Sequence, residues 1–408
     1  MELVNSADSS KELFSFIFSC WSLIRSSACW VALHSIQLVR QILNLQVNRL
    51  PDIEQKPSNE IQSPLVRPSG YADASLTVQY QVGLDIIGVG AAGQVYNVDD
   101  YTVLKSCRIY ERPSNNATAR ALWDYASETI FHVGLLKDER AVSRLLAERP
   151  HPNIVEVIDV DQPEGIYIRK YRPYSDSIQA CQSDRILWYQ DIIRALLHLH
   201  TLGITHSDIR KDNILFDSSG HALLSDFSAS CPFGYPNPSM PLFSNGPFET
   251  VSDATDRFAM GSLIYELETG IRSEISTDSC DGLILPPIQT GNSGLDSLVE
   301  HAWRGRFDST ADMLKHAENL SDSQDSRRPI VYSASKAELR GRVSLWRKTR
   351  IKEYGNCPFC DMCSRSLSLL LGCVLFSLPT EQQLQILAER YGWRPDDERH
   401  FLVDYSVS

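Results

Sequence analysis

Apolar side chains first recur with the spacing of strands and later with the spacing of helices along the middle of the chain. Strand-like segments occupy 95–104, 154–160 and 165–171, which are short and rich in Val, Ile and Tyr. Residues 138–146 carry apolar side chains at helical intervals, which predicts a helix between these strands. A longer stripe of the same period over 184–202 predicts a second, buried helix.

A short hairpin is predicted after the second helix. Residues 214–216 and 222–224 are apolar and flank a Ser-Ser-Gly turn, and the run from Asp208 to Asn213 before them is polar. The hairpin would return Asp226 to that polar loop. Two carboxylates and an amide would then share one cleft, which suits a base that orients a hydroxyl and ligands for one or two magnesium ions. A solvated turn is the alternative.

A glycine-rich stretch lies near the start of the strands. Its glycines stand at 88, 90 and 93, in the pattern Gly-x-Gly-x-x-Gly-x-Val. In a dinucleotide-binding fold such a stretch opens a helix, but the residues after Gly93 are extended. Strand, glycine turn and strand would let backbone amides approach phosphate groups closely. Lys105 ends a strand 17 residues after Gly88.

These motifs, in this order, resemble those of eukaryotic protein kinases. His206-x-Asp208, Asn213 and Asp226-Phe227 match the catalytic and metal-binding loops of that family, and 252–267 matches its central helix. The similarity covers about residues 80–320 and extends to kinase-like proteins common in fungi. It implies an α+β, bilobal fold with an antiparallel-sheet N-lobe that holds one helix and a mainly helical C-lobe.

The resemblance also implies ATP and Mg²⁺ as cofactors and a protein as substrate. It assigns catalytic roles to Asp208, Arg210, Lys105 and Glu139, and magnesium binding to Asn213 and Asp226. It assigns nucleotide binding to Gly88, Val89, Gly90, Ala91, Ala92, Gly93, Val95, Lys105, Lys170, Tyr171 and Arg172.

Two of these assignments carry an alternative. Glu139 is the expected partner of Lys105, with Glu128 as the second choice, and residues 106–133 would be an insertion in the N-lobe. Asp256 would accept hydrogen bonds from backbone amides of the catalytic loop, as its counterpart does in the family. Capping of the central helix is the other role open to it.

Three residues depart from the family pattern. Ser207 replaces the arginine that in many kinases binds a phosphorylated activation segment, so control by such phosphorylation is not expected. Arg210 stands where serine/threonine kinases have lysine, and some tyrosine kinases carry arginine there. Ser228 replaces the glycine of Asp-Phe-Gly and removes its free access to positive φ.

The departures leave three functions open. Because Lys105, Asp208, Asn213 and Asp226 all persist, an active protein kinase is favoured, with serine or threonine as the default acceptor. A pseudokinase that binds ATP and regulates a partner is the alternative. A small-molecule kinase is disfavoured by the complete glycine loop and by the helix at Asp256.

The chain divides into five segments by composition. They are an apolar segment at 1–49, a Pro/Ser-rich linker at 50–79, the N-lobe at 80–170, the C-lobe at 171–320 and an extension at 321–408 with predicted helices at 334–350 and 380–391. The apolar runs within 13–39 are each shorter than the about 20 residues that a spanning helix needs. A packed helix or a helix on a membrane surface is expected there, with a single anchor as the alternative.

Net charge and cysteine content limit the classes of binding partner and the cellular compartment that we expect. The 408 residues carry a formal charge of −12, which argues against nucleic acid or an anionic membrane as the main partner. Ten cysteines without a secretory signal indicate a reducing, cytoplasmic location. Cys357, Cys360, Cys363 and Cys373 lack the usual pair-spacer-pair pattern of zinc ligands, which favours free thiols over a metal site.

Overall fold

The structure is a computed structural model of the whole chain. It describes residues 76, 78–81, 84–90, 93–114, 116–175, 180–237, 245–277, 282–321, 332–354 and 381–391. The apolar segment, nearly all of the linker, Ala91, Ala92 and the cysteine cluster lie outside these residues. No helix among the described residues is both long enough and apolar enough to cross a membrane.

Two compact units divide the chain. Residues 78–112 and 128–383 form one unit, and residues 1–77, 113–127 and 384–408 form the other. The site and all the contacts described below lie within the first unit. Helix α10 (Glu381–Tyr391) begins near the C-terminal end of the first unit.

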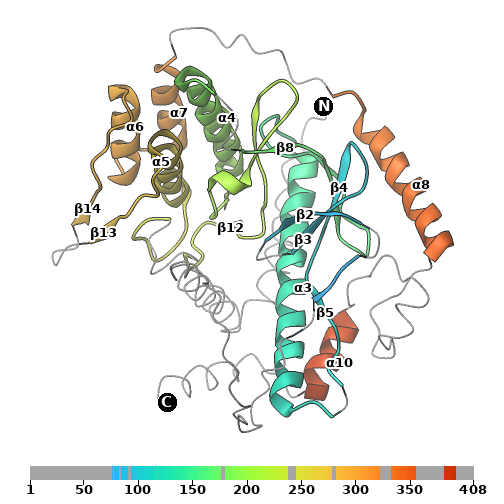
Figure 1. The fold of residues 1–408 in the computed structure, drawn as a ribbon. Helices are drawn as coiled ribbons and strands as arrows, with labels where there is room; N and C mark the ends of the chain where they lie inside the picture. Colours follow the sequence, from blue (N-terminus) through green and yellow to red (C-terminus); the bar gives the residue numbers. More distant parts are fainter. Residues whose placement is uncertain are drawn as a thin grey trace, which may run out of the picture. The chain divides into compact units, whose positions relative to one another are not determined.

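A five-stranded antiparallel sheet forms the N-lobe (Figure 1). Its spatial order is β2 (Ile86–Val89), β3 (Gln94–Asn97), β4 (Thr102–Ser106), β7 (Ile166–Arg169) and β6 (Val157–Asp159). A separate pair joins β1 (Val78–Gln79) to β5 (Ile109–Tyr110). In the main sheet, Lys105 lies opposite Val95 on β3 and opposite Ile166 on β7. Residues two apart on a strand share a face, so Lys105 and Leu104 point to opposite sides of the sheet.

One long helix, α3 (Ala119–Glu148), lies beside this sheet (Figure 1). The sequence pattern predicted a helix at 138–146, which α3 contains, although α3 begins much earlier. Residues 106–133, the predicted insertion, hold β5 and the first half of α3. Gly134 lies inside the helix, where a glycine costs only about 1 kcal/mol relative to alanine. Residues 119–133 contain neither proline nor glycine, so nothing local ends the helix before the predicted part begins.

Helices build most of the C-lobe. These are α4 (Gln182–Thr201), α5 (Asp253–Thr269), α6 (Ser293–Trp303) and α7 (Thr310–Glu318). Their buried side chains form one hydrophobic core with the hairpin of β10 (Ile214–Phe216) and β11 (Ala222–Leu224). The predicted hairpin is therefore confirmed, in the register Ile214 to Leu224.

Short elements connect these parts. They are β8 (Arg172–Pro173), which pairs with β10, the 3-10 turn η1 (Lys211–Asn213), β9 (Ile204–Thr205), which pairs with β12 (Cys231–Pro232), and the pair β13 (Ser276–Thr277) and β14 (Leu283–Ile284). The loop of the candidate site lies between β9 and β10.

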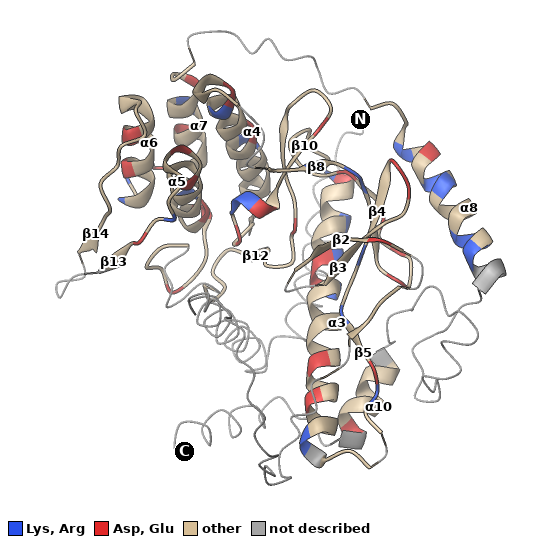
Figure 2. Cartoon of the chain, viewed as in Figure 1, with Lys and Arg blue, Asp and Glu red and all other residues tan. Residues whose placement is uncertain are grey.

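Helix α8 (Lys336–Tyr354) covers the outer face of the N-lobe sheet, the face on which Leu104 lies. Leu339 and Val343 are buried there, and Trp346 packs against the same cluster. The side chains that they meet come from β3, β4, β6 and β7, and are Tyr96, Leu104, Ile158 and Tyr167. Lys and Arg alternate with other residues along the helix (Figure 2). A segment that the sequence assigned to a separate extension thus completes the packing of the sheet.

Gly165 marks a close approach between two of the central strands, which gives a first testable prediction. A Cβ atom at this position would lie 2.2 Å from the backbone oxygen of Lys105. Because that oxygen belongs to the sheet backbone, it cannot move without disturbing β4. We expect Gly165→Ala to lower the free energy of unfolding by about 2 kcal/mol or more, measured by urea unfolding. Gly220→Ala, at φ 86° and with no atom within 4 Å of the added Cβ, carries the backbone strain of a positive φ without a clash, and so separates the steric effect from that strain. Equal losses in the two variants would contradict the steric explanation.

Candidate active site

The loop between β9 and β10 is anchored by a buried carboxylate on α5. Asp256 is fully buried and accepts hydrogen bonds from the backbone amides of His206 at 2.8 Å and Ser207 at 3.0 Å. The imidazole of His200 lies 2.9 Å from the same carboxylate. The predicted role of Asp256 is confirmed, whereas its alternative role as a helix cap is wrong because Ser252 caps α5.

Anchoring by Asp256 is accompanied by an unusual backbone conformation at Ser207. Its φ is 64°, in the left-handed region that costs a residue with a Cβ about 1–2 kcal/mol. Two consecutive amides can then point to one carboxylate. The Ser207 hydroxyl lies 2.6 Å from the hydroxyl of Thr205, and its backbone oxygen accepts a bond from the Asn245 amide at 2.8 Å. The Ser207 side chain, at the position that lacks the family's arginine, thus makes a neutral hydrogen bond.

Asp208 and Asn213 are joined directly. The Asn213 side-chain nitrogen donates to the backbone oxygen of Asp208 at 2.8 Å and to its carboxylate at 2.9 Å. Burial raises the pKa of Asp208, and the nearby Asp226 carboxylate adds to the rise, while the Arg210 guanidinium opposes it. A carboxylate with a raised pKa accepts a proton more readily.

Lys105 joins β4 to two acidic residues from distant parts of the chain. Its ammonium lies 2.7 Å from Glu139 of α3 and 2.8 Å from Asp226, just beyond β11. Glu128, the second choice, instead accepts a bond from the Tyr110 hydroxyl at 3.3 Å. Burial alone would lower the pKa of Lys105 and raise that of Asp226, but their mutual attraction reverses both shifts. Lys105 and Asp226 are therefore charged at neutral pH, whereas burial raises the pKa of Glu139 and its attraction to Lys105 opposes that rise.

Ser228 contributes a contact that its replacement of glycine did not suggest. Its hydroxyl donates to Asp226 Oδ1 at 2.7 Å, and its backbone amide lies 3.3 Å from the same oxygen. Among the described residues other than glycine, positive φ occurs at Ser207 and Asp226 and not at Ser228. The serine thus needs no freedom of glycine here, and it helps to hold the pKa of Asp226 below its ordinary value.

Removal of that hydroxyl should loosen Asp226. We expect Ser228→Ala to raise the Mg²⁺ concentration needed for half-maximal nucleotide binding about threefold, because a hydrogen bond to a carboxylate is lost. A magnesium titration at a fixed nucleotide concentration would measure the change. Ser230→Ala is the matched variant, since its hydroxyl donates to the backbone oxygen of His206 instead. An unchanged midpoint in Ser228→Ala would show that the contact does not orient Asp226.

Asn213 and Asp226 offer oxygen atoms of the kind that Mg²⁺ prefers. The side-chain nitrogen of Asn213 makes both bonds to Asp208, so the side-chain oxygen of Asn213 takes no part in them. The side-chain donors Lys105 and Ser228 both engage Asp226 at Oδ1. No group of three His, Cys, Asp or Glu among the described residues could hold a metal ion alone. A magnesium ion would therefore need ligands such as water and phosphate oxygens as well.

Arg210 lies at the edge of this loop. Its guanidinium is 2.8 Å from the carboxylate of Asp212, and both side chains are largely exposed. This pairing could not be predicted from the sequence, because a polar loop has no period that reveals its side-chain partners.

The glycine-rich loop connects β2 and β3. Gly88 and Val89 lie on β2, and Val95 lies on β3 opposite Lys105. The amide of Gly90 donates to the backbone oxygen of Gly93 at 2.9 Å, which closes the turn.

Arg108 also contacts this turn. Its guanidinium donates to the backbone oxygen of Gly90 at 3.0 Å. A Cβ at position 93 would lie 2.1 Å from the backbone oxygen of Ser106, so only glycine fits there.

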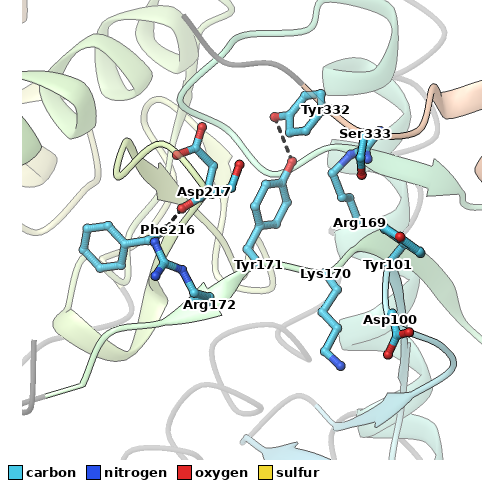
Figure 3. A pocket seen from close by; sticks show the side chains of 11 residues that line it. Asp100, Tyr101, Arg169, Lys170, Tyr171, Arg172, Phe216, Asp217, Tyr332 and Ser333 are labelled. Atoms are coloured by element: carbon cyan, nitrogen blue, oxygen red, sulfur yellow. Dashed lines mark hydrogen bonds between the residues drawn. The ribbon is translucent and has the colours of Figure 1, made fainter. Parts of the chain in front are cut away.

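The linker Lys170–Arg172 follows β7 and borders a pocket of about 400 Å³ (Figure 3). The pocket is lined by Asp100, Tyr101, Arg169, Lys170, Tyr171, Arg172, Phe216, Asp217, Ser218, Tyr332 and Ser333. None of Lys105, Asp208, Asn213 and Asp226 lines it. The linker side chains thus line a space that does not include these four residues. Tyr332 and Arg169 were missed from the sequence because no motif marks them.

Comparisons with known proteins agree with this geometry. Residues 82–274 match the model of the protein kinase domain. The chain is 26% identical to CBL-interacting protein kinase 22 of Oryza sativa subsp. japonica over 190 residues, 43% of this chain and 41% of the relative. It is 25% identical to serine/threonine-protein kinase Nek5 of Mus musculus over 258 residues, 54% of this chain and 37% of the relative. The chain thus spans about two fifths of the length of these relatives.

Proposed function

Because residues 82–274 form a divergent eukaryotic protein kinase domain, we propose that this chain transfers the γ-phosphoryl group of ATP to a hydroxyl of a protein. Serine or threonine is the proposed acceptor, since the relatives include serine/threonine kinases. The observation that carries the proposal is the double ion pair of Lys105 with Glu139 and Asp226. It joins strand, helix and metal-binding loop at one buried point.

Lys105 is suited to bind phosphate while these pairs hold it. An ammonium group has three N–H donors, of which two point to Glu139 and Asp226. The third can donate to a phosphate oxygen of ATP, and the backbone amides of the glycine-rich loop can approach the same phosphates. Because Glu139 is buried and fixed on α3, the lysine loses little freedom when the nucleotide binds.

Asp208 is the proposed proton acceptor. The substrate hydroxyl would donate a hydrogen bond to its carboxylate, which Asn213 holds in place. As the hydroxyl oxygen forms a bond to the γ-phosphorus, the bond from that phosphorus to the bridging oxygen breaks and ADP leaves. The hydroxyl proton passes to Asp208, whose raised pKa suits it to receive the proton.

Asn213 and Asp226 would hold magnesium through their side-chain oxygens. When bound, the ion neutralises charge on the phosphate oxygens. Arg210 would add positive charge near Asp208. Its ion pair with Asp212 lies at the edge of the loop.

A regulatory scaffold that binds ATP without turnover is the second candidate. Lys105 and Ser228 both donate hydrogen bonds to Asp226 Oδ1, and these bonds compete with magnesium for that oxygen. This competition favours the scaffold. In this case nucleotide would stabilise the fold, and its binding would regulate a partner.

One experiment separates the two candidates. The full chain would be incubated with MgATP and a mixed peptide library, and the phosphorylated residues would be identified by mass spectrometry. Transfer by the parent that Asp226→Asn abolishes would support the kinase and reveal its acceptor. No transfer above the variant, while ATP raises the melting temperature of the parent, would favour the scaffold. The full chain is required because α8 forms part of the folded unit.

A further inference from the structure

Each residue of the linker Lys170–Arg172 is held by a different part of the chain. The amide of Lys170 donates to the backbone oxygen of Tyr101 at 2.8 Å, in the turn between β3 and β4. The guanidinium of Arg172 donates to the backbone oxygen of Asp217 at 2.8 Å, just after β10. Both of these partners lie within the matched kinase domain.

Tyr171, the middle residue of the linker, is held from outside the matched domain. Its hydroxyl lies 3.1 Å from the hydroxyl of Tyr332, and the two rings meet edge to face at a centroid distance of 6.3 Å (Figure 3). The backbone amide of Glu156 also donates to the Tyr171 hydroxyl, at 3.2 Å. The ring of Tyr171 is thereby fixed at its far end.

Arg169 gives Tyr332 a second contact beside the linker. Its guanidinium lies 4.0 Å from the centroid of the Tyr332 ring and donates to the backbone oxygen of Ala334 at 2.8 Å. The same guanidinium is 2.6 Å from the carboxylate of Glu156. Arg169 is 5% exposed, and a cation so well removed from water binds an aromatic face more strongly than an exposed one does.

The position of Tyr332 is set in turn by α8. Ala334 is buried in the same cluster as Leu339 and Val343, which pack on the outer face of the sheet. Since the segment 332–335 leads directly into this helix, docking of α8 brings Tyr332 to the linker. The C-terminal segment thus joins the sheet and the linker in one set of contacts.

We propose that Tyr332 is a positioning residue for nucleotide binding, which acts by fixing the linker through Tyr171 and Arg169. The inference rests on the proposed function, together with the nucleotide-binding role that the resemblance to protein kinases implies for Lys170, Tyr171 and Arg172. A linker held in its binding conformation loses less freedom when the nucleotide arrives, so affinity rises without a new contact to the ligand. ATP affinity therefore depends on a residue far beyond the matched domain.

Nucleotide affinity of the full chain tests this dependence. The probe is a non-hydrolysable ATP analogue with Mg²⁺, and its dissociation constant is measured by calorimetry beside kcat and KM for ATP. We expect Tyr332→Ala to weaken binding and raise KM about tenfold while kcat changes less than about twofold. Tyr332→Phe keeps the ring under Arg169 but loses the hydroxyl, and an increase of about threefold is expected.

Val299→Ala is the matched control, because it removes methyl groups from the buried C-lobe core on α6 and leaves α8 and Tyr332 intact. It should lower the melting temperature without changing the dissociation constant. Parental affinity in both Tyr332 variants would overturn the proposal, and so would equal weakening in Val299→Ala, which would show that affinity follows overall stability. Absence of nucleotide binding by the folded parent would reject the proposed function as well. Parental binding with unaffected variants rejects the role of Tyr332 alone.

Discussion

Replacement of Asp208 by asparagine is expected to lower kcat for phosphoryl transfer about 100- to 10,000-fold, the usual contribution of a general base. Asparagine preserves the size of the side chain and can still contact Asn213, which lies 2.9 Å from the carboxylate of Asp208. It cannot accept the proton of the substrate hydroxyl. Because burial raises the pKa of Asp208, the parent carboxylate is the stronger base that the variant loses.

Three measurements make this result specific. The dissociation constant for MgATP should change less than about threefold, since Asp208 is assigned to the hydroxyl and not to the nucleotide. The melting temperature should stay near that of the parent. Asp161→Asn removes a carboxylate that is largely exposed and pairs with Arg144, and its kcat should equal that of the parent. A kcat of Asp208→Asn above one tenth of the parental value would remove Asp208 from the proposed mechanism.

Arg347→Met is expected to lower the free energy of unfolding by about 3–5 kcal/mol, the cost of breaking a buried ion pair from one side. Glu164, at the turn between β6 and β7, is 1% exposed, and its carboxylate lies 2.5 Å from the guanidinium of Arg347. The hydroxyl of Tyr167 donates to the same carboxylate at 2.6 Å but brings no charge. Without Arg347 this buried carboxylate loses the cation paired with it and keeps the weaker attraction of Arg140.

Urea unfolding would measure this loss against two further variants. Lys348→Met removes the same charge from an exposed position on α8 and should change stability by less than about 0.5 kcal/mol. Addition of Glu164→Gln to Arg347→Met removes the stranded charge and should restore part of the stability. If Arg347→Met and Lys348→Met were equally stable, the ion pair would not hold α8 to the sheet.

The motifs at the site could be predicted because their chemistry demands certain residue types at short separations. Asp208 and Asn213 stand on one loop, and the hairpin returned Asp226 to it, so spacing alone brought three groups together. Glu139 was assigned through the resemblance to protein kinases, in a segment of helical period, and it lies beside Lys105. Helix α3, which carries Glu139, begins much earlier than the helical period at 138–146 indicated, because a long helix with mixed contacts shows no single apolar stripe.

Contacts of the C-terminal segment could not be predicted in the same way. The sequence predicted a helix at 334–350, and Leu339, Val343 and Trp346 do recur at helical intervals. Such a stripe indicates that a helix packs on something, but it does not identify the surface. Tyr332 stands before the helix, where no period applies, so only the structure brings it to Tyr171.

The pairing of Glu164 with Arg347 also bears on how the protein folds as it is synthesised. The two residues are 183 positions apart, so the strands of the N-lobe emerge from the ribosome long before the helix that covers them. Until that helix arrives, the outer face of the sheet, with Tyr96, Leu104 and Tyr167, is exposed to water or to chaperones. Contacts so distant in sequence form slowly. The N-lobe can therefore be completed only after α8 has been synthesised.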